Sequence, residues 1–198
     1  AFTLHHGKYT GIVYGGSSRK QKKNFQIGNK ISLSWKSKSE GKIGYFSAEL
    51  IRAIAPAFFE DKKKSLCIFT ASSILKILLP DRQINKKIYL SFEKMINQLN
   101  LGDWIKLYVL WELSLIKELG FDINLNSDHN LVENKQTIEI NNKTYKIPNL
   151  LLFNNNNFTN RDVRESLIFN KNLLMENFII PNNLQLPFSR NLLEKYYL

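Results

Sequence analysis

The hydrophobic pattern of this chain changes its period close to Pro56, and this change limits the folds that the chain can adopt. Before Pro56, β-branched and aromatic residues form short, partly alternating runs separated by glycine-containing turns, which is typical of strands. After it, apolar residues recur every three to four positions, which is typical of amphipathic helices. The sequence therefore predicts an α+β fold in which residues 1–56 and 57–198 form separate domains.

The first domain is predicted to consist of short strands. Because no helix pattern interrupts them, a small barrel or a curled sheet is expected. The glycine-containing turn at residues 39–44 suits a hairpin between the last two strands. The expected strands cover residues 1–4, 9–14, 31–38 and 45–54.

The second domain is predicted to be mainly helical. Its clearest helix spans residues 101–119, where Trp104 and Trp111 share one face and are expected to pack in the core, and Gly120 provides a C-cap. Short loops make neighbouring helices antiparallel. The other expected elements are helices from about residue 63 to Pro80 and over residues 84–99, 161–177 and 186–196, and a hairpin over residues 137–147 with Asn141-Asn142 as its turn.

The positive charge of the chain is concentrated near its start. The formal net charge is +11, and residues 1–55 contribute +8 of it, with ten Lys and Arg residues against two acidic ones. A coding composition biased toward Lys, Asn and Ile would spread the excess evenly along the chain. The uneven distribution instead favours a local polyanion partner, of which nucleic acid is the usual example.

The densest charge follows Gly15-Gly16. Four cations fall within five positions, and a core cannot hold four unpaired charges. We expect residues 15–23 to form a basic loop between strands, with its cations facing water or an anion. Many proteins that bind single-stranded nucleic acid present charge in this way beside a small sheet. The four cations are Arg19, Lys20, Lys22 and Lys23.

Two aromatic residues flank this segment. Tyr14 directly precedes it, and Trp35 lies in a predicted strand beside Lys36. For both rings, stacking on bases and ordinary packing are the alternatives. The predicted nucleic-acid-binding set therefore comprises the four cations together with Tyr14, Trp35 and Lys36.

The sequence contains no recognisable catalytic constellation. His5 and His6 are adjacent, so on a strand they point to opposite faces, and we expect them to be turn or edge residues. The single cysteine, Cys67, excludes an internal disulfide and a multi-cysteine zinc site, and is expected to be buried. Glu112 and Glu118 lie on different faces of a helix, where a solvated or ion-paired role is expected. No phosphate-binding glycine loop or nucleophile elbow is present, so neither an enzyme nor a cofactor is expected.

Three stretches of the sequence, spread from one end to the other, resemble those of a known family. The first comprises residues 3–8, 15–20 and 26–29, the second is LYVLWELSLIKELGF at 107–121, and the third is LPFSRNLL at 186–193. Their order and content resemble the RecO family of recombination mediators, and are most similar to its alphaproteobacterial branch.

For the fold, the resemblance implies an oligonucleotide-binding (OB) barrel followed by a helical domain. It also implies about two strands before the position of Ala1, so we expect the barrel to lack its opening strands and to expose an edge. Many family members carry a four-cysteine zinc site after the second stretch. No cysteine follows Cys67 in this chain, so zinc is not expected.

For function, the resemblance implies a non-catalytic role in recombinational DNA repair. The family binds single- and double-stranded DNA, promotes strand annealing, and helps to load RecA onto strands covered by single-strand-binding protein. Single-strand-binding protein and RecR are the implied protein partners. A cytoplasmic, nucleoid-associated location in a bacterium is expected, without a membrane partner, because no signal peptide and no membrane-spanning run is found in the sequence.

Two other classes of function remain open from the residues alone. An OB-type RNA-binding or ribosome-associated module would also account for the strands and the charge, and would prefer structured RNA to single-stranded DNA. A protein-interaction scaffold whose basic character is only compositional would bind no nucleic acid even at low salt.

Overall fold

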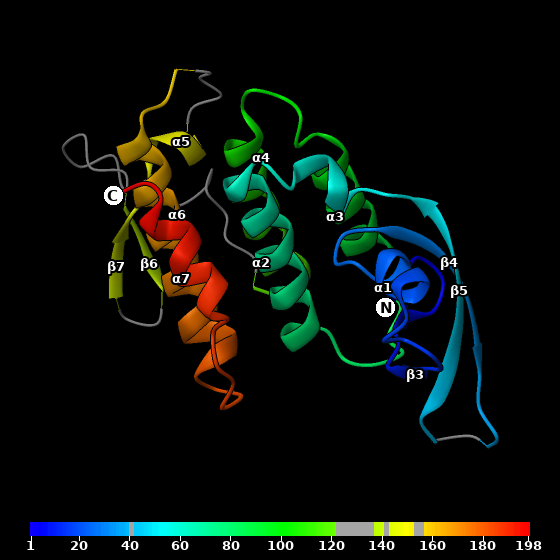
Figure 1. Ribbon diagram of the computed structural model, residues 1–198. Coiled ribbons are helices and arrows are strands. Elements are labelled where there is room, and N and C mark those ends of the chain that lie inside the picture. The colour runs from blue at the N-terminus through cyan, green and yellow to red at the C-terminus, as the bar shows by residue number, and fades with distance from the viewer. Residues whose placement is uncertain (40–41, 122–136, 141–142, 153–156) are drawn as a thin grey trace. The chain divides into compact units, whose positions relative to one another are not determined.

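The computed structural model describes residues 1–39, 42–121, 137–140, 143–152 and 157–198 (Figure 1). The chain forms two compact units, an N-terminal unit of Ala1–Leu90 and a C-terminal unit of Ser91–Leu198. Strands and helices both occur, which confirms the α+β fold class. The domain boundary expected at residue 56 stays a prediction.

The N-terminal unit contains a three-stranded sheet in the order β3–β5–β4. Strand β5 (Gly44–Arg52) lies in the centre, antiparallel to β4 (Lys30–Lys36) and parallel to β3 (Gly11–Val13). The antiparallel pairing of β4 with β5 confirms the expected hairpin, although residues 40–41 of its turn lie outside the described residues.

Two very short strands precede this sheet. Strands β1 (Phe2–Thr3) and β2 (Gly7–Lys8) pair with each other, and His5 and His6 lie exposed in the turn between them, as expected. Within the described part of the N-terminal unit, the strands form these two separate sheets and no closed barrel.

The basic segment after Gly15-Gly16 is not the loop that the sequence predicted, because its cations lie on a short helix, α1 (Arg19–Asn24). The Ser18 side chain caps the helix by accepting a hydrogen bond from the backbone N–H of Gln21. Gln21, Asn24 and Phe25, spaced three and four positions apart, are all partly buried. These three residues form the inward face of the segment, and the helical conformation places them together on that face.

The remaining elements of the N-terminal unit are the 3₁₀ helix η1 (Ala55–Phe58) and the helix α2 (Lys62–Leu78). Asp61 caps α2 at its start, and the helix ends before Pro80 as predicted. Cys67 is completely buried in this helix, which confirms its expected place. Helix α3 (Lys86–Asn97) runs across the boundary between the two units.

The C-terminal unit is built around α4 (Trp104–Glu118) and α6 (Asn160–Leu174), which pack against each other. Trp104 and Trp111 are buried, so their predicted core role is confirmed. A capping box between Thr159 and Asp162 begins α6. The other elements are the antiparallel hairpin of β6 (Thr137–Ile140) and β7 (Lys143–Lys146), α5 (Asn149–Leu152), the π-helix η2 (Met175–Ile179) and α7 (Phe188–Lys195).

The hairpin is tied to η2 by one carboxylate. Glu176 accepts hydrogen bonds from Lys143 Nζ at 2.6 Å and from the Tyr145 hydroxyl at 2.5 Å. Burial and the bond to Glu176 raise the pKa of Tyr145 to about 12, while the bonds from Lys143 and Tyr145 lower the pKa of Glu176. The predicted hairpin is thus confirmed, with Asn141 and Asn142 of its turn outside the described residues.

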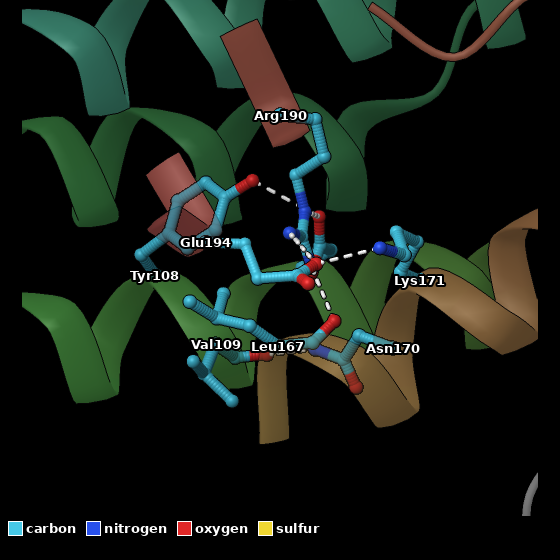
Figure 2. A network of polar contacts seen from close by, with 8 residues as sticks. Tyr108, Val109, Leu167, Asn170, Lys171, Arg190 and Glu194 are labelled. Carbon is cyan, nitrogen blue, oxygen red and sulfur yellow. Dashed lines mark hydrogen bonds and ion pairs between the residues drawn. The ribbon is translucent and has the colours of Figure 1, made fainter. Parts of the chain in front are cut away.

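A buried ion pair lies at the centre of the C-terminal unit (Figure 2). Arg190 Nε donates to Glu112 Oε1 at 2.6 Å and its Nη2 donates to Oε2 at 3.0 Å, and both side chains are 0% exposed. The Tyr108 hydroxyl adds a bond to Glu112 Oε1 at 2.9 Å, and the Leu167 carbonyl accepts another from Arg190. Burial alone would lower the pKa of the guanidinium, but the Glu112 carboxylate reverses this effect and raises it. Of the two roles expected for Glu112, ion pairing is therefore the correct one.

This pair joins two of the stretches on which the family resemblance depends. Tyr108 and Glu112 belong to residues 107–121, and Arg190 belongs to residues 186–193. Asn170 contributes to the same region by donating to the Val109 carbonyl at 2.9 Å, while Lys171 donates to Glu194 at 2.9 Å (Figure 2). The two stretches therefore meet in one polar network inside the C-terminal unit.

Candidate nucleic-acid interface

One face of the three-stranded sheet is exposed and carries aromatic rings beside a cation. In the register of the sheet, Tyr45 on β5 lies opposite Lys36 on β4 and beside Ile12 on β3, and all three are exposed. Registered neighbours point to the same side of a sheet. Tyr14 follows β3 and packs the edge of its ring against Tyr45, with the centroids 5.5 Å apart. We call this surface, made of Ile12, Tyr14, Lys36 and Tyr45, the outer face.

The outer face leaves its rings open to solvent. Tyr14 is 73% exposed and Tyr45 is 37% exposed, although both are large and largely apolar. Contiguous exposed apolar patches often mark interaction sites, and each ring offers a flat face for a nucleic-acid base. Lys36 lies directly across the strand from Tyr45 and can reach a phosphate beside a stacked base.

Helix α1 adds three exposed cations to the same unit. Arg19, Lys22 and Lys23 lie on one helical face, and within the described residues none of their side chains makes an ion pair. Lys20 lies in the same helix, but its side chain is outside the description. Five positions separate Tyr14 from Arg19, so their Cα atoms are at most about 18 Å apart. The cations and the outer face thus lie within a short distance of each other in the N-terminal unit.

An asparagine holds α1 in place. Asn29 donates from its Nδ2 atom to the backbone carbonyls of Lys23, at 2.9 Å, and Asn24, at 3.4 Å, at the end of the helix. Its Oδ1 atom accepts from the backbone N–H groups of Ile54, at 2.9 Å, and Ala55, at 3.1 Å. One side chain therefore connects the end of α1 to the segment after β5. Asn29 lies in one of the stretches, residues 26–29, that resembles the family.

Trp35 does not share the outer face. It is adjacent to Lys36 on β4, so it points to the opposite side of the sheet, where it lies opposite Phe46. The Tyr9 ring packs edge-on against its indole with the centroids 5.1 Å apart, and the Arg82 guanidinium lies over it at 5.4 Å. Of the residues predicted to bind nucleic acid, the structure thus brings Tyr14 and Lys36 together and places Trp35 elsewhere.

We expect tryptophan fluorescence to separate these two surfaces. In the Tyr14→Trp, Trp35→Phe variant, a single-stranded oligonucleotide should quench the new indole, because that ring is open for stacking. Trp35 of the wild-type protein should show little quenching, since other side chains already cover it. The difference between wild-type and Trp35→Phe emission isolates its signal. Quenching of Trp35 with no change at position 14 would assign the stacking role to the other side of the sheet.

Sequence reasoning missed Tyr45 and Arg82. Tyr45 could have been found from the alternation of the strand that contains it, once its register with Lys36 is known, because that register places a second ring beside Tyr14. Arg82 gives no such signal. It lies in a loop more than forty residues after Trp35 in the sequence, and only the fold brings the two together.

Two other kinds of feature, a metal centre and a membrane-spanning helix, are not found among the described residues. No group of three or more His, Cys, Asp or Glu side chains among them is placed to hold a metal ion. None of the helices described is both long and apolar enough to cross a membrane.

Comparison with known proteins identifies the family. The model of the recombination protein O C-terminal region matches residues 60–164, just over half of the chain. The chain therefore belongs to the RecO family, and the resemblance noted in the sequence is confirmed. The matched residues include the Tyr108 and Glu112 part of the buried network, whereas the outer face and α1 precede them.

Individual relatives agree with this assignment. The DNA repair protein RecO of Roseobacter denitrificans is 31% identical over 125 residues, which cover 63% of this chain and 52% of that protein. A protein of the same name from a Ruegeria species is 31% identical over 127 residues, covering 64% and 53%, and one from Rhodospirillum centenum is 27% identical over 125 residues, covering 63% and 50%. The matched part of the chain spans about half the length of these relatives.

Proposed function

We propose that this chain binds DNA in recombinational repair, as a protein without catalytic activity of its own. The observation that carries the proposal is the exposed Tyr14–Tyr45 pair beside Lys36, in the same unit as the exposed α1 cations Arg19, Lys22 and Lys23. The relatives named DNA repair protein RecO support a role in repair. Following the family, the protein would bind single and double strands, promote annealing, and help to load RecA onto strands covered by single-strand-binding protein, with that protein and RecR as partners.

The α1 cations and the outer face would make different contributions to the free energy of DNA binding. Arg19, Lys22 and Lys23 would neutralise phosphates, which is an ionic, salt-sensitive interaction that is independent of sequence. The rings of the outer face would stack on bases, which tolerates any sequence because every base has a π-face. Cations that neutralise two strands at once lower the repulsion between them, and this is a direct physical route to annealing.

We further propose that the three-stranded sheet is part of an oligonucleotide-binding barrel. Strands β3 and β4 lie at the edges of the sheet, so each has one side that is not paired within this sheet. Such barrels commonly bind single strands across an exposed sheet surface with aromatic residues on it. The outer face has this composition.

Removal of the α1 cations should weaken binding to every sequence. In the Arg19→Gln, Lys22→Gln, Lys23→Gln variant, we expect at least about a tenfold loss of affinity for an oligonucleotide, because three phosphate contacts disappear. The dependence of log affinity on log salt should fall by about 2 for a single strand. Fluorescence anisotropy with a labelled oligonucleotide at several salt concentrations measures both quantities.

A matched control removes the same charge from the other unit. Lys146, Arg164 and Lys195 are exposed cations of the C-terminal unit, and their joint replacement by Gln lowers the net charge by the same amount. This control should retain nearly all of the affinity. Equal losses in both variants would show that only net charge matters and would contradict the assignment to α1. A preference for structured RNA would indicate an RNA-binding module, and failure to bind nucleic acid at low salt would indicate a protein scaffold.

A further inference from the structure

A small cationic pocket lies at the end of the sheet where β3 and β5 begin. It has a volume of about 250 Å³ and is lined by Thr10, Lys42, Ile43, Asp81 and Arg82. None of these residues belongs to α1 or to the outer face. The pocket is smaller than the 300–1,000 Å³ that is usual for sites of drug-sized ligands, so its volume suits one phosphate with its sugar.

Arg82 is held in position before any ligand arrives. Its guanidinium carbon lies 5.4 Å from the centre of the Trp35 ring and 5.6 Å from that of Tyr9, within cation–π range of both. Its backbone N–H donates to the Lys8 carbonyl at 2.8 Å. Its φ is +61°, a backbone conformation that residues other than Gly rarely adopt. Backbone outliers of this kind cluster at functional sites. Because the guanidinium is already ordered, little further entropy is lost when it binds an anion.

The charges that face the pocket favour an anion. Lys42 and Arg82 are both exposed, and within the described residues neither makes an ion pair. The one carboxylate in the lining, Asp81, lies 3.3 Å from Lys8 Nζ, so a cation outside the lining offsets its charge. Two cations and one compensated carboxylate leave an excess of positive charge at the pocket.

The pocket adjoins the outer face at the end of the sheet. Ile43 lines the pocket and precedes Tyr45 by two positions, which corresponds to about 7 Å along a strand. A strand that runs from Tyr45 past Ile43 and around the end of the sheet would place a neighbouring nucleotide at the pocket, where Arg82 approaches from the Trp35 side. A duplex cannot follow this path, because its bases stay paired and its width exceeds that of the pocket.

We propose that this pocket binds one nucleotide of a single strand, with Arg82 and Lys42 on its phosphate, and that it makes the N-terminal unit prefer single strands to duplex. This inference rests on the proposed function, since it extends the path that begins at Tyr14 and Tyr45. Asp81 weakens the site through its residual negative charge. Thr10 offers a hydroxyl that can donate to a phosphate oxygen.

The test compares four proteins on two ligands. Affinities for a labelled oligo-dT and for a duplex of the same length are measured at one moderate salt concentration for wild type, Arg82→Gln, Arg82→Lys and Asp81→Asn. Arg82→Gln should lose about tenfold in affinity for the single strand and less than about twofold for the duplex. Arg82→Lys, which keeps the charge but loses the planar fork, should fall between wild type and Arg82→Gln. Asp81→Asn should bind the single strand about two- to threefold more tightly.

The two substitutions at the pocket are expected to change the affinity for the single strand in opposite directions. The opposite effects of Arg82→Gln and Asp81→Asn support the proposal, since a merely structural role for the loop would weaken binding in both variants. Melting temperatures show whether either variant is folded, and a folded Arg82→Gln protein with equal losses on both ligands would overturn the pocket. If the α1 variant loses binding while the Arg82 variants match wild type, the pocket fails and the proposed function stands. If wild type binds neither ligand, both fail.

Discussion

Replacement of Glu112 by Gln should cost about 3–5 kcal/mol of folding stability, which is a large part of what a domain of this size possesses. The substitution keeps the shape of the side chain but removes the carboxylate that accepts two bonds from the fully buried Arg190 guanidinium, and leaves the more distant Glu194 carboxylate, 3.7 Å from Nη1, to balance its charge. Arg190→Met should lower the folding stability by a similar amount, because it leaves the Glu112 carboxylate buried without the guanidinium that pairs with it. Urea denaturation followed by circular dichroism measures the loss.

A double replacement distinguishes the pair from the individual residues. In Glu112→Leu, Arg190→Met both charges are removed together, so the variant should recover much of the stability that either single change loses. The exposed pair Arg161–Glu165 on α6 provides a control, and Arg161→Ala should change stability by less than about 0.5 kcal/mol. If the single replacements cost no more than this surface control, the network would not stabilise the C-terminal unit.

The Gly44→Ala variant should lose about 3 kcal/mol or more of folding stability through overpacking. The destabilisation should be confined to the N-terminal unit. A Cβ atom at this position would lie 2.5 Å from Trp35 Nε1 and 2.6 Å from the Lys36 carbonyl, and closer still to Trp35 Cε2. Neither the indole nor the strand backbone can move aside, because Tyr9 and Arg82 cover the ring and β4 is paired with β5. Thermal unfolding and hydrogen exchange of β3, β4 and β5 test this prediction.

Gly102→Ala is the matched control for this change. A Cβ atom there meets nothing within 4 Å, so stability should stay close to that of wild type. Stability of Gly44→Ala equal to that of Gly102→Ala would show that Trp35 has room to shift. Because Trp35 also supports Arg82, the Gly44 variant should bind single strands less well even at temperatures where it remains folded.

The elements that could be predicted from the sequence are those with a local, periodic signal. Helix α4 repeats its buried residues at helical spacing, and β4 and β5 are neighbours in the sequence that pair with each other, so both follow from nearby residues. Helix α1 could not be predicted in this way. Its inward face consists mainly of Gln21 and Asn24, which are polar, and its anchoring depends on Asn29 and on the backbone after β5.

The candidate site was only partly predictable for a related reason. The cations and Tyr14 stand out by composition and position, but the choice between the two sides of the sheet depends on register. Alternation alone places Trp35 and Lys36 on opposite sides of β4, and yet it does not say which side is covered. That is decided by Tyr9 and by Arg82, which reach the indole from other parts of the chain.

The buried ion pair also has a consequence for the folding of the C-terminal unit during synthesis, because its two residues are made at different times. Glu112 and Arg190 are 78 positions apart, so α4 leaves the ribosome long before its partner exists. Until α7 is made, packing α4 and α6 together would bury a carboxylate without its counter-ion, and this opposes early compaction. We therefore expect the unit to assemble late, because its central contact closes a loop of 78 positions. Chaperones and proteases would meet an open α4 during that interval, and loss of α7 would prolong the exposure indefinitely.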